Sequence, residues 1–317
     1  MPELRNLGRS SLQTPRLVLG GNVFGWTVAG EDAFRILDRF VEAGGVMIDT
    51  ADVYSAWVPG HQGGESESLI GEWLKRRGSS EGVLIATKVG MLPGEGGQKL
   101  EAARIAAAAE ASLKRLGVEA IDLYYAHQDD PDTPMEESLR AFDALVQAGK
   151  VKVLGASNFT AARLAEALTL AERMGTARYE VLQPEYHLLA REEFEAELQP
   201  LCMAEEVAVL PYYGLASGFL TGKYRSREDF GKSVRGGRME RFWNDRGFAV
   251  LAALDAVAGE AGASPAQVAL AWIAAQPGLT APIASARTPE QLEEIVGAMT
   301  LDLTEEQVAR LNGASRS

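Results

Sequence analysis

Eight short apolar runs, separated by segments with helical patterns, constrain the fold of this chain more than any other feature of its sequence. Such runs are typical of parallel strands buried on both faces, between which a helix returns the chain. They predict an α/β fold, a (β/α)8 TIM barrel, whereas an open doubly wound sheet fits eight regular units less well. The runs are Leu17–Leu19, Val46–Ile48, Val83–Ala86, Ile121–Ala126, Val151–Leu154, Glu180–Leu182, Val207–Leu210 and Ala281–Ala284.

Several helices between the runs have sequence signals for their ends. Capping boxes are predicted to begin at Thr133, Ser264, Thr288 and Thr304, and in the first three a proline follows at the first helical position. Gly149 is predicted to end the helix that follows Thr133, just before the next apolar run.

The chain shows no boundary between domains. Its 317 residues suffice for two average domains or one barrel, but no Pro/Gly/Ser-rich linker or charge block divides it. We therefore expect a single domain over residues 1–317, in which the segment LRNLGRSSLQTP forms a small hairpin ahead of the first barrel strand. Two long polar, Gly-rich segments, Trp57–Gly64 and Tyr224–Asp245, are predicted to be loops at the C-terminal face that either act as lids or binding loops or are disordered.

Charge and composition limit the partners of the protein. A formal net charge of -13 disfavours binding to nucleic acid and to anionic lipid surfaces. No apolar stretch approaches the roughly 20 residues of a membrane span, and the first ten residues lack the apolar centre of a signal peptide. Cys202 is the only cysteine, so no intrachain disulfide forms. We expect a cytoplasmic protein with no nucleic-acid or membrane partner.

Polar side chains stand where several of the predicted strands end. Each has a simple structural explanation when taken alone, for example a turn cap for an aspartate or a solvated position for a lysine. In a barrel, however, the carboxyl ends of all strands meet at one face, where active sites are found. The residues are Asp49 with Tyr54 in the next turn, Lys88, His127, Ser157, Asn158 and Gln183.

The sequence around these residues resembles the aldo-keto reductase family. The resemblance is carried by GVMIDTADVYS, ATKVG, LYYAHQDDPDTPMEESLRAFDALVQAGKVKVLGASNF, LQPEYHLL, LPYYGLASGFLTGKY and PIASARTPEQLEE, which span nearly the whole chain. It implies a (β/α)8 barrel and an NADPH-dependent enzyme that reduces small-molecule aldehydes and ketones to alcohols. No metal is required for this chemistry.

The resemblance implies a catalytic tetrad of Asp49, Tyr54, Lys88 and His127. Hydride transfer to a carbonyl carbon leaves an alkoxide, which Tyr54 would protonate as general acid. Lys88 would stabilise the phenolate and lower the pKa of Tyr54, and Asp49 would hold the ammonium in place. His127 would orient the carbonyl oxygen.

The resemblance also implies residues for a bound NADP(H). Small residues near the pyrophosphate would let backbone N–H groups approach its oxygens, and an arginine before a helix N-terminus suits an anion. No G-x-G-x-x-G follows a strand, so a Rossmann binding mode is not expected. The implied residues are Ser157, Asn158 and Gln183 at the carboxamide, Tyr212 stacked on the nicotinamide, Leu215, Gly218, Thr221, Gly222 and Lys223 at the pyrophosphate, and Ser285, Arg287, Gln291 and Glu294 at the adenosine end.

The sequence departs from the family in three places near these residues. The common Tyr-Ser-Pro-Leu is replaced by Tyr212 followed by Tyr213, Gly214 and Leu215. The usual Glu-Asn pair of the adenine motif ends in Ile295, and Ser285 stands where a glycine is usual. The departures concern how tightly the cofactor is held, and the location of its site is unaffected.

The substrate is the feature that the sequence defines least. Aromatic loop residues predicted to surround the carbonyl site indicate a planar or apolar compound, although ordinary loop packing also explains them. Two rival functions remain: an NADPH-binding accessory protein similar to potassium-channel β subunits, and a Schiff-base aldolase with Lys88 as nucleophile. The oligomeric state is left open. The aromatic residues are Phe24, Trp26, Trp57, Phe242 and Trp243.

Overall fold

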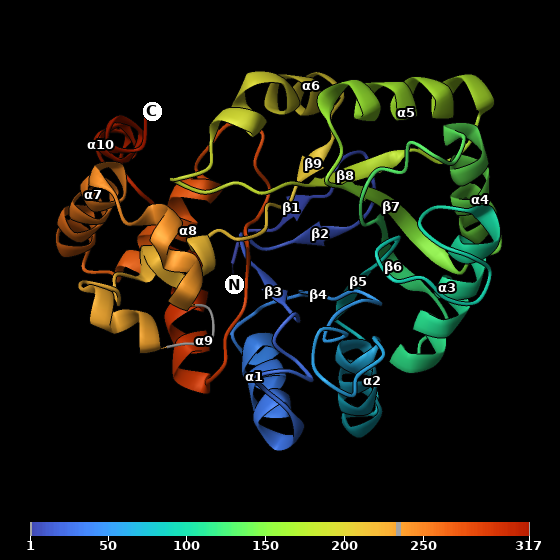
Figure 1. Ribbon diagram of the computed structural model, residues 1–317, viewed down its shortest axis with the longest axis horizontal. Helices are drawn as coiled ribbons and strands as arrows, with labels where there is room; N and C mark the ends of the chain where they lie inside the picture. The colour runs from blue at the N-terminus through green and yellow to red at the C-terminus, as the bar shows by residue number, and fades with distance from the viewer. Residues whose placement is uncertain (1, 233–235, 317) are drawn as a thin grey trace.

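Eight parallel strands form one strongly curved sheet at the centre of the protein, consistent with a (β/α)8 fold (Figure 1). The structure is a computed structural model that describes residues 2–232 and 236–316. Each predicted apolar run overlaps one of the strands, so the predicted series of parallel strands is confirmed. In spatial order the strands are β10 (Ile283–Ala284), β3 (Val18–Gly20), β4 (Met47–Asp49), β5 (Leu84–Val89), β6 (Ile121–Ala126), β7 (Val151–Ser157), β8 (Tyr179–Gln183) and β9 (Ala208–Val209).

Backbone hydrogen bonds also join the two ends of this sheet. The N–H of Thr280 donates to the carbonyl of Val209 at 2.9 Å, and the N–H of Ile283 donates to the carbonyl of Pro211 at 2.8 Å. These bonds connect β10 to the segment of β9, so backbone N–H and C=O groups at the edges of both strands are hydrogen-bonded.

Helices surround the sheet and cover its outer face (Figure 1). They follow the strands in the order that the sequence predicts, and two of them separate β9 from β10. The helices are α1 (Gly30–Glu42), α2 (Glu65–Arg77), α3 (Ala102–Leu116), α4 (Met135–Gln147), α5 (Ala161–Met174), the π-helix η1 (Phe194–Leu198), α6 (Gln199–Ala204), α7 (Asp245–Ala261), α8 (Pro265–Ala274), α9 (Pro289–Val296) and α10 (Glu305–Ala314), with 3-10 turns at η2 (Ala216–Thr221) and η5 (Gly297–Met299).

Alternate residues of each strand belong to two separate hydrophobic layers. Met47 and Ala86 pack inside the barrel, whereas Ile48 and Ile85 pack between the strands and the helices. Side chains of a strand point to opposite faces with a period of two. Asp49, two residues beyond Met47, is therefore directed toward the barrel axis.

The predicted N-terminal hairpin is present and covers one end of the barrel. Strand β1 (Arg5–Asn6) pairs in antiparallel fashion with β2 (Gln13–Thr14), and Leu7 belongs to the interior hydrophobic cluster of the barrel. Arg5 donates hydrogen bonds to the carbonyls of Ala274 at 2.8 Å and Thr280 at 3.1 Å. Because Thr280 precedes β10, the hairpin covers the amino ends of the strands and leaves the carboxyl ends open.

The predicted helix caps are confirmed in part. Ser264 and Thr304 form complete capping boxes at the starts of α8 and α10. Thr288 accepts a hydrogen bond from the N–H of Gln291, but the Gln291 side chain accepts from the N–H of Arg287, so the box is incomplete.

The prediction for Thr133 is wrong. Pro134 is the N-cap of α4, and the Thr133 hydroxyl instead donates to Asp130 Oδ2 at 2.7 Å. A nearby carboxylate competes with the helix N–H groups for this hydroxyl. At the other end α4 stops at Gln147, and Gly149 then adopts a φ of 72°, as predicted for a helix stop.

The two long segments lie on the side of the strands' carboxyl ends. Residues of Trp57–Gly64 form turns without helix or strand, as predicted. The segment Tyr224–Asp245 is more ordered than predicted, because it contains two 3-10 helices, η3 (Arg227–Lys232) and η4 (Gly236–Phe242). Residues 233–235 of this segment lie outside the described residues.

Helices α7 and α8 are the apolar pair between β9 and β10. Trp272 of α8 is fully buried and stacks on Tyr186, with ring centroids 5.4 Å apart. Within the described part of the chain, no single helix is long and apolar enough to cross a membrane. Only α7 and α8 taken together, with a bend of 93° between them, reach the required length and composition.

We predict that Gly155→Ala lowers the stability of the barrel. A Cβ at Gly155 would overlap the Tyr125 ring and lie 3.1 Å from the carbonyl oxygen of Val181. Overpacking of this kind costs about 1–3 kcal/mol, which urea unfolding would measure as a lower free energy of unfolding. Gly259→Ala is the control, since nothing lies within 4 Å of a Cβ there. That substitution in α7 should add about 0.5–1 kcal/mol. Equal stability of the two variants would contradict the packing argument.

Candidate active site

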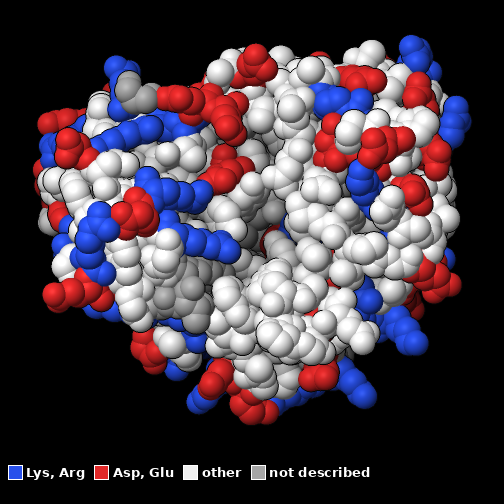
Figure 2. All heavy atoms as spheres, viewed as in Figure 1, with Lys and Arg blue, Asp and Glu red and all other residues white. Residues whose placement is uncertain are grey.

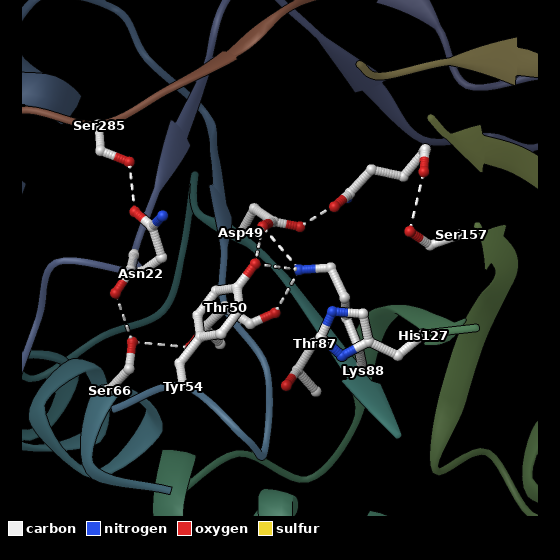
Figure 3. Close-up of polar contacts among 12 residues, drawn as sticks. Asn22, Asp49, Thr50, Tyr54, Ser66, Thr87, Lys88, His127, Ser157 and Ser285 are labelled. Atoms are coloured by element: carbon white, nitrogen blue, oxygen red, sulfur yellow. Dashed lines mark hydrogen bonds and ion pairs between the residues drawn. The ribbon is translucent and has the colours of Figure 1, made fainter. Parts of the chain in front are cut away.

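Three of the predicted catalytic side chains meet at the carboxyl ends of β4 and β5 (Figure 3). Lys88 Nζ lies 2.7 Å from Asp49 Oδ2 and 3.0 Å from the hydroxyl oxygen of Tyr54. The Tyr54 hydroxyl is also 3.4 Å from Asp49 Oδ2. Asp49 and Lys88 end up together because β4 and β5 are neighbours in the sheet and both residues point inward.

The Lys88 ammonium is fully buried and has an acceptor for each of its three protons. Besides Asp49 and Tyr54, it donates to the backbone carbonyl of Thr50 at 2.7 Å. The second oxygen of Asp49 accepts from Gln183 Nε2 at 2.9 Å. A buried ion pair is stable only when such hydrogen bonds replace the lost water, and these contacts fix the position of the ammonium.

The ionisation of Tyr54 depends on its burial and on the charges beside it. Burial, followed by the charge of Asp49, raises the pKa of Tyr54 well above its ordinary value. The lowering expected from Lys88 stays a prediction, and an ammonium at 3.0 Å acts in that direction against the burial. The phenol consequently keeps its proton at neutral pH, which is the state that a general acid requires. Burial lowers the pKa of Lys88, and the carboxylate of Asp49 opposes this shift.

His127 faces the Tyr54 ring and is almost fully buried. Their ring centroids are 6.1 Å apart, and Figure 3 shows the imidazole beside the phenol. Burial and the charge of Lys88 hold the pKa of His127 well below its ordinary value, so the imidazole is neutral. Its Nδ1 is buried and has no hydrogen-bond partner among the described residues. A neutral imidazole at this place can donate one hydrogen bond to a substrate oxygen.

A second polar group follows at the ends of β7 and β8. Asn158 Nδ2 donates to the backbone carbonyl of His127 at 2.8 Å, and Asn158 Oδ1 accepts from the Tyr212 hydroxyl at 2.8 Å. The Ser157 hydroxyl donates to the Gln183 carbonyl at 2.8 Å. Asn158 has a φ of 56°, a conformation that asparagine tolerates better than most residues. These bonds fix an array of amide and hydroxyl groups beside the Tyr212 ring.

One elongated cavity of about 660 Å³ connects these groups to the far end of the barrel mouth. Figure 2 shows a central hollow with an uncharged lower and right rim and with basic side chains reaching its left rim. The size is within the range of sites for small molecules and cofactors. Of the predicted site residues, those that line the cavity are Asp49, Tyr54, His127, Ser157, Asn158, Gln183, Tyr212, Leu215, Gly218, Thr221, Lys223, Ser285, Arg287, Gln291 and Glu294, together with the aromatic residues Trp26 and Trp57.

The segment after Tyr212 has the features of an anion-binding cradle. Backbone φ is negative at Leu215 and positive at Ala216, Ser217 and Gly218, and the N–H groups of Ala216 and Gly218 donate to carbonyls within this tight turn. The Ser217 hydroxyl is buried at the cavity wall and has no partner among the described residues. A Cβ at Gly218 would lie 3.3 Å from Lys223 Nζ, so the glycine leaves room for an ammonium over the cradle. These residues fit a pyrophosphate.

The far end of the cavity also suits an anion. Arg287 precedes α9, and no carboxylate of the described residues lies within ion-pair distance of its guanidinium. The Ser285 hydroxyl donates to Asn22 Oδ1 at 2.7 Å. An unpaired guanidinium beside a helix N-terminus favours phosphate binding.

The departures from the family pattern have local structural reasons. A Cβ at Gly214 would lie 2.9 Å from Ile273 Cδ1, so glycine lets the side chains of α8 approach the backbone closely there. Tyr213 adopts a φ of 58° and packs edge-on against Tyr212, with ring centroids 5.0 Å apart. Ile295 is buried at the cavity wall and provides an apolar surface where an asparagine is usual.

Three aromatic residues predicted for the substrate pocket are not part of its wall, so this prediction is wrong for them. Phe24 is fully buried in the hydrophobic layer between strands and helices. Phe242 packs against Phe219 in the core, and Trp243 packs between Phe230 and Phe248. None of the three lines the cavity, because each packs against apolar side chains of the hydrophobic clusters.

Gly222 does not line the cavity, although its neighbours Thr221 and Lys223 do, so its predicted place at the pyrophosphate stays a prediction. It ends η2 with a φ of 75°, and its carbonyl accepts from Arg225 Nε at 2.6 Å. Its role is therefore to turn the chain after the cradle.

Several cavity residues were missed by sequence reasoning. Ser217 lies in LPYYGLASGFLTGKY, between the predicted pyrophosphate residues Leu215 and Gly218, so its hydroxyl is a recognisable candidate. Asn22 follows a strand end, as the recognised residues do. Met91 and Tyr213 had no signal, because only the fold shows that their side chains reach the rim.

Comparison with known proteins agrees with this geometry. A sequence profile described as the Aldo/keto reductase family matches residues 16–316. The chain is 34% identical to Aldo-keto reductase str7 of Strobilurus tenacellus, with 96% of this chain and 86% of that protein covered. It is 33% identical to norsolorinic acid reductase stcV of Emericella nidulans, with 94% and 78% covered. It is 30% identical to a probable voltage-gated potassium channel subunit beta of Arabidopsis thaliana, with 94% and 91% covered.

Parallel strands around a buried carboxylate, ammonium and phenol, beside a long cavity with basic groups at its far end, are features of an oxidoreductase that uses a dinucleotide. The chain belongs to the Aldo/keto reductase family. Membership implies NAD(P)H-dependent oxidoreduction of small-molecule carbonyl compounds.

We predict that His127 shows no ionisation across neutral pH. Because its folded-state pKa lies well below the ordinary value, its ring proton signals should not shift between about pH 6 and pH 8. Two-dimensional NMR would test this, with His127→Gln identifying the signal. His61, which is partly exposed, serves as the internal comparison. An inflection near pH 6.5 for His127 would show that the imidazole is hydrated and not enclosed.

Proposed function

We propose that this protein is an NADPH-dependent reductase that converts aldehydes and ketones to alcohols. The observation that carries the proposal is the contact of the Tyr54 hydroxyl with Lys88 Nζ, beside a neutral His127, at one end of a cavity with Arg287 at the other. The test is steady-state oxidation of NADPH with a panel of aldehydes and ketones. Absence of turnover with all of them would favour an accessory role like that of channel β subunits.

Each residue of the site has a separate role in the proposed reaction. The bound dinucleotide supplies a hydride to the carbonyl carbon. As negative charge develops on the carbonyl oxygen, the Tyr54 hydroxyl donates its proton to that oxygen. Lys88 then stabilises the phenolate across the 3.0 Å contact, and Asp49 keeps the lysine charged. His127 donates a hydrogen bond that orients the oxygen before transfer.

The contacts of Lys88 argue against the aldolase alternative. A Schiff-base lysine must be neutral and free to attack a carbonyl carbon. Here the ammonium is paired with Asp49, and all three of its protons have acceptors in the protein. Borohydride with substrate should therefore leave no adduct on Lys88.

The dinucleotide is proposed to lie along the whole cavity. Asn158, Ser157 and Gln183 offer amide and hydroxyl groups for the carboxamide, and Tyr212 offers a ring for stacking. Ser217, Gly218 and Lys223 would hold the pyrophosphate. Leu215, Thr221, Gln291 and Glu294 complete the wall.

The rim next to Tyr54 favours an aromatic or other planar carbonyl compound. Trp26 and Trp57 pack edge to face with ring centroids 5.6 Å apart, and Trp57 remains 49% exposed. Met91, on the loop after β5, is 37% exposed at the same rim. Exposed apolar side chains that share a rim usually cover a ligand. A single catalytic domain, located in the cytoplasm, completes the proposal.

We predict that Tyr54→Phe abolishes carbonyl reduction and leaves NADPH affinity within a few-fold of wild type. The phenol supplies the proton, and general acids typically contribute about 10²–10⁴-fold to a rate. Fluorescence titration would give the affinity, and NADPH oxidation would give kcat. Retention of more than about a tenth of kcat would exclude Tyr54 as the acid.

We predict that Arg287→Ala weakens NADPH binding by about tenfold or more and hardly changes NADH binding. The cofactors differ by a 2′-phosphate, and a charge-assisted contact to it is worth about 1.5–3 kcal/mol. Lys223→Ala is the matched control, since a pyrophosphate contact is common to both cofactors and both should weaken alike. Equal losses in the Arg287 variant would show that Arg287 does not recognise the 2′-phosphate.

A further inference from the structure

A second buried cluster of charges, the outer cluster, lies behind the catalytic strand β5. It consists of Asp52, Glu67, Arg104 and Arg115, from the loop after β4 and from helices α2 and α3. Asp52 and Glu67 are fully buried and Arg104 is 6% exposed. Arg104 Nη2 lies 3.2 Å from Asp52 Oδ2, and Arg115 Nη2 lies 2.6 Å from Glu67 Oε2. None of the four lines the cavity.

Strand β5 separates this cluster from the active site. Lys88 points inward, and Thr87 points to the outer side, as Figure 3 shows. The Thr87 hydroxyl donates to Glu67 Oε1 at 2.6 Å, and the N–H of Asp52 donates to the Lys88 carbonyl at 3.2 Å. Adjacent residues of one strand therefore contact the two groups of charges, and the outer cluster packs against the backbone that positions Lys88.

Arg104 connects two loops of the active site. Besides its ion pair with Asp52, its Nη1 donates to the carbonyl of Glu95 at 3.2 Å. Asp52 lies two residues before Tyr54, and Glu95 belongs to the loop after β5 that also carries Met91. Gly94 allows this contact, since a Cβ there would lie 2.7 Å from Arg104 Nη1.

We propose that Asp52 and Arg104 are positioning residues, and that their ion pair holds the loops of Tyr54 and Met91 to helix α3. The inference rests on the proposed function of Tyr54. The pair has a single contact, and Asp52 Oδ1 and Arg104 Nε are buried with no partner among the described residues. Such a contact holds the loop only while the carboxyl is charged, because the neutral acid retains little attraction for the guanidinium.

The surroundings of Asp52 make its charge depend on pH. Glu67 from α2, Arg104 and Arg115 from α3, Tyr124 from β6 and the ammonium of Lys88 from β5 are the charged or titratable groups facing it. Burial and the charge of Glu67 raise the pKa of Asp52 to about 7, although the two arginines oppose the shift. The ion pair is therefore complete above about pH 7 and is lost as the pH falls through that value.

Because the pKa of Asp52 is raised, a positioning role of its ion pair and a purely stabilising role predict different effects of substitution. A carboxyl whose folded pKa is raised contributes stability below its unfolded pKa, and that contribution is lost as the pH rises through 7. Ionised Asp52 thus costs stability in the range in which it holds the loop. Asparagine, which imitates the neutral acid, should be as stable as aspartate near pH 6 and at least as stable near pH 8.

Asp52→Asn tests the proposal through kcat, KM, NADPH affinity and thermal unfolding at about pH 6 and pH 8. We expect kcat to fall roughly tenfold at pH 8 and to approach the wild-type value at pH 6, because misplaced groups slow the chemical step. NADPH affinity should stay within about threefold, because neither residue lines the cavity, and Tm at pH 8 should not fall. A ratio of variant to wild-type kcat that is independent of pH would overturn the proposal.

Asp122→Asn is the matched control. Asp122 is also a buried aspartate, paired with Lys152 at 2.8 Å, but it lies near the amino end of β6, away from the active site. Its substitution should leave kcat unchanged at both pH values. A pH-dependent loss of kcat in this variant as well would show that any buried aspartate has the effect.

Hydrogen exchange of the loop separates this proposal from the proposed function. Peptides that span residues 49–58 and 91–97 should exchange faster in Asp52→Asn and in Arg104→Gln than in wild type at pH 8, without substrate present. If exchange changes but wild type reduces no carbonyl compound, the positioning role stands and the proposed function fails. Unchanged exchange in both variants would overturn the positioning role.

Discussion

The buried ion pair between Lys88 and Asp49 is the interaction on which the active site depends. Removing two charges from water costs several kcal/mol for each ion, and attraction alone rarely repays it. Here Thr50, Tyr54 and Gln183 supply the additional hydrogen bonds. The same bonds fix the phenol relative to the ammonium, so the contacts that make the burial tolerable also build the proton donor.

The position of this ion pair follows from the geometry of parallel strands. The ends of β4 and β5 lie side by side, and the period of two directs Asp49 and Lys88 to the barrel axis and Thr87 to the helices. Charges therefore lie on both sides of one strand. The carboxylates of Asp52 and Glu67 raise the pKa of Lys88 from the outer side, as Asp49 does from the inner side. The charge of Lys88 is thus supported by carboxylates that do not line the cavity.

The remainder of the cavity shows how an acidic protein can accommodate an anionic cofactor. With a net charge of -13, long-range attraction opposes a dinucleotide, so local groups must provide the binding. Arg287 and Lys223 line the wall, as does Ser217, whose buried hydroxyl has no partner among the described residues. Neither Arg287 nor Lys223 is within ion-pair distance of a carboxylate of the described residues, so both remain available to an anion.

The sequence by itself determined the series of strands and the residues at their ends, because a period of two and parallel strand ends are local rules. Asp49, Lys88 and His127 were found in this way, as was the hairpin. The sequence did not determine which of two possible contacts a side chain makes. The Thr133 hydroxyl binds Asp130 and does not cap α4, and Phe24 and Phe242 pack in the core and do not line the cavity. Only the tertiary structure decided that Asp52 meets Arg104 from α3, 52 residues later. Such contacts depend on how the helices pack on the sheet. A rotation of α3 about its axis by the angle between successive residues would separate Arg104 from Asp52.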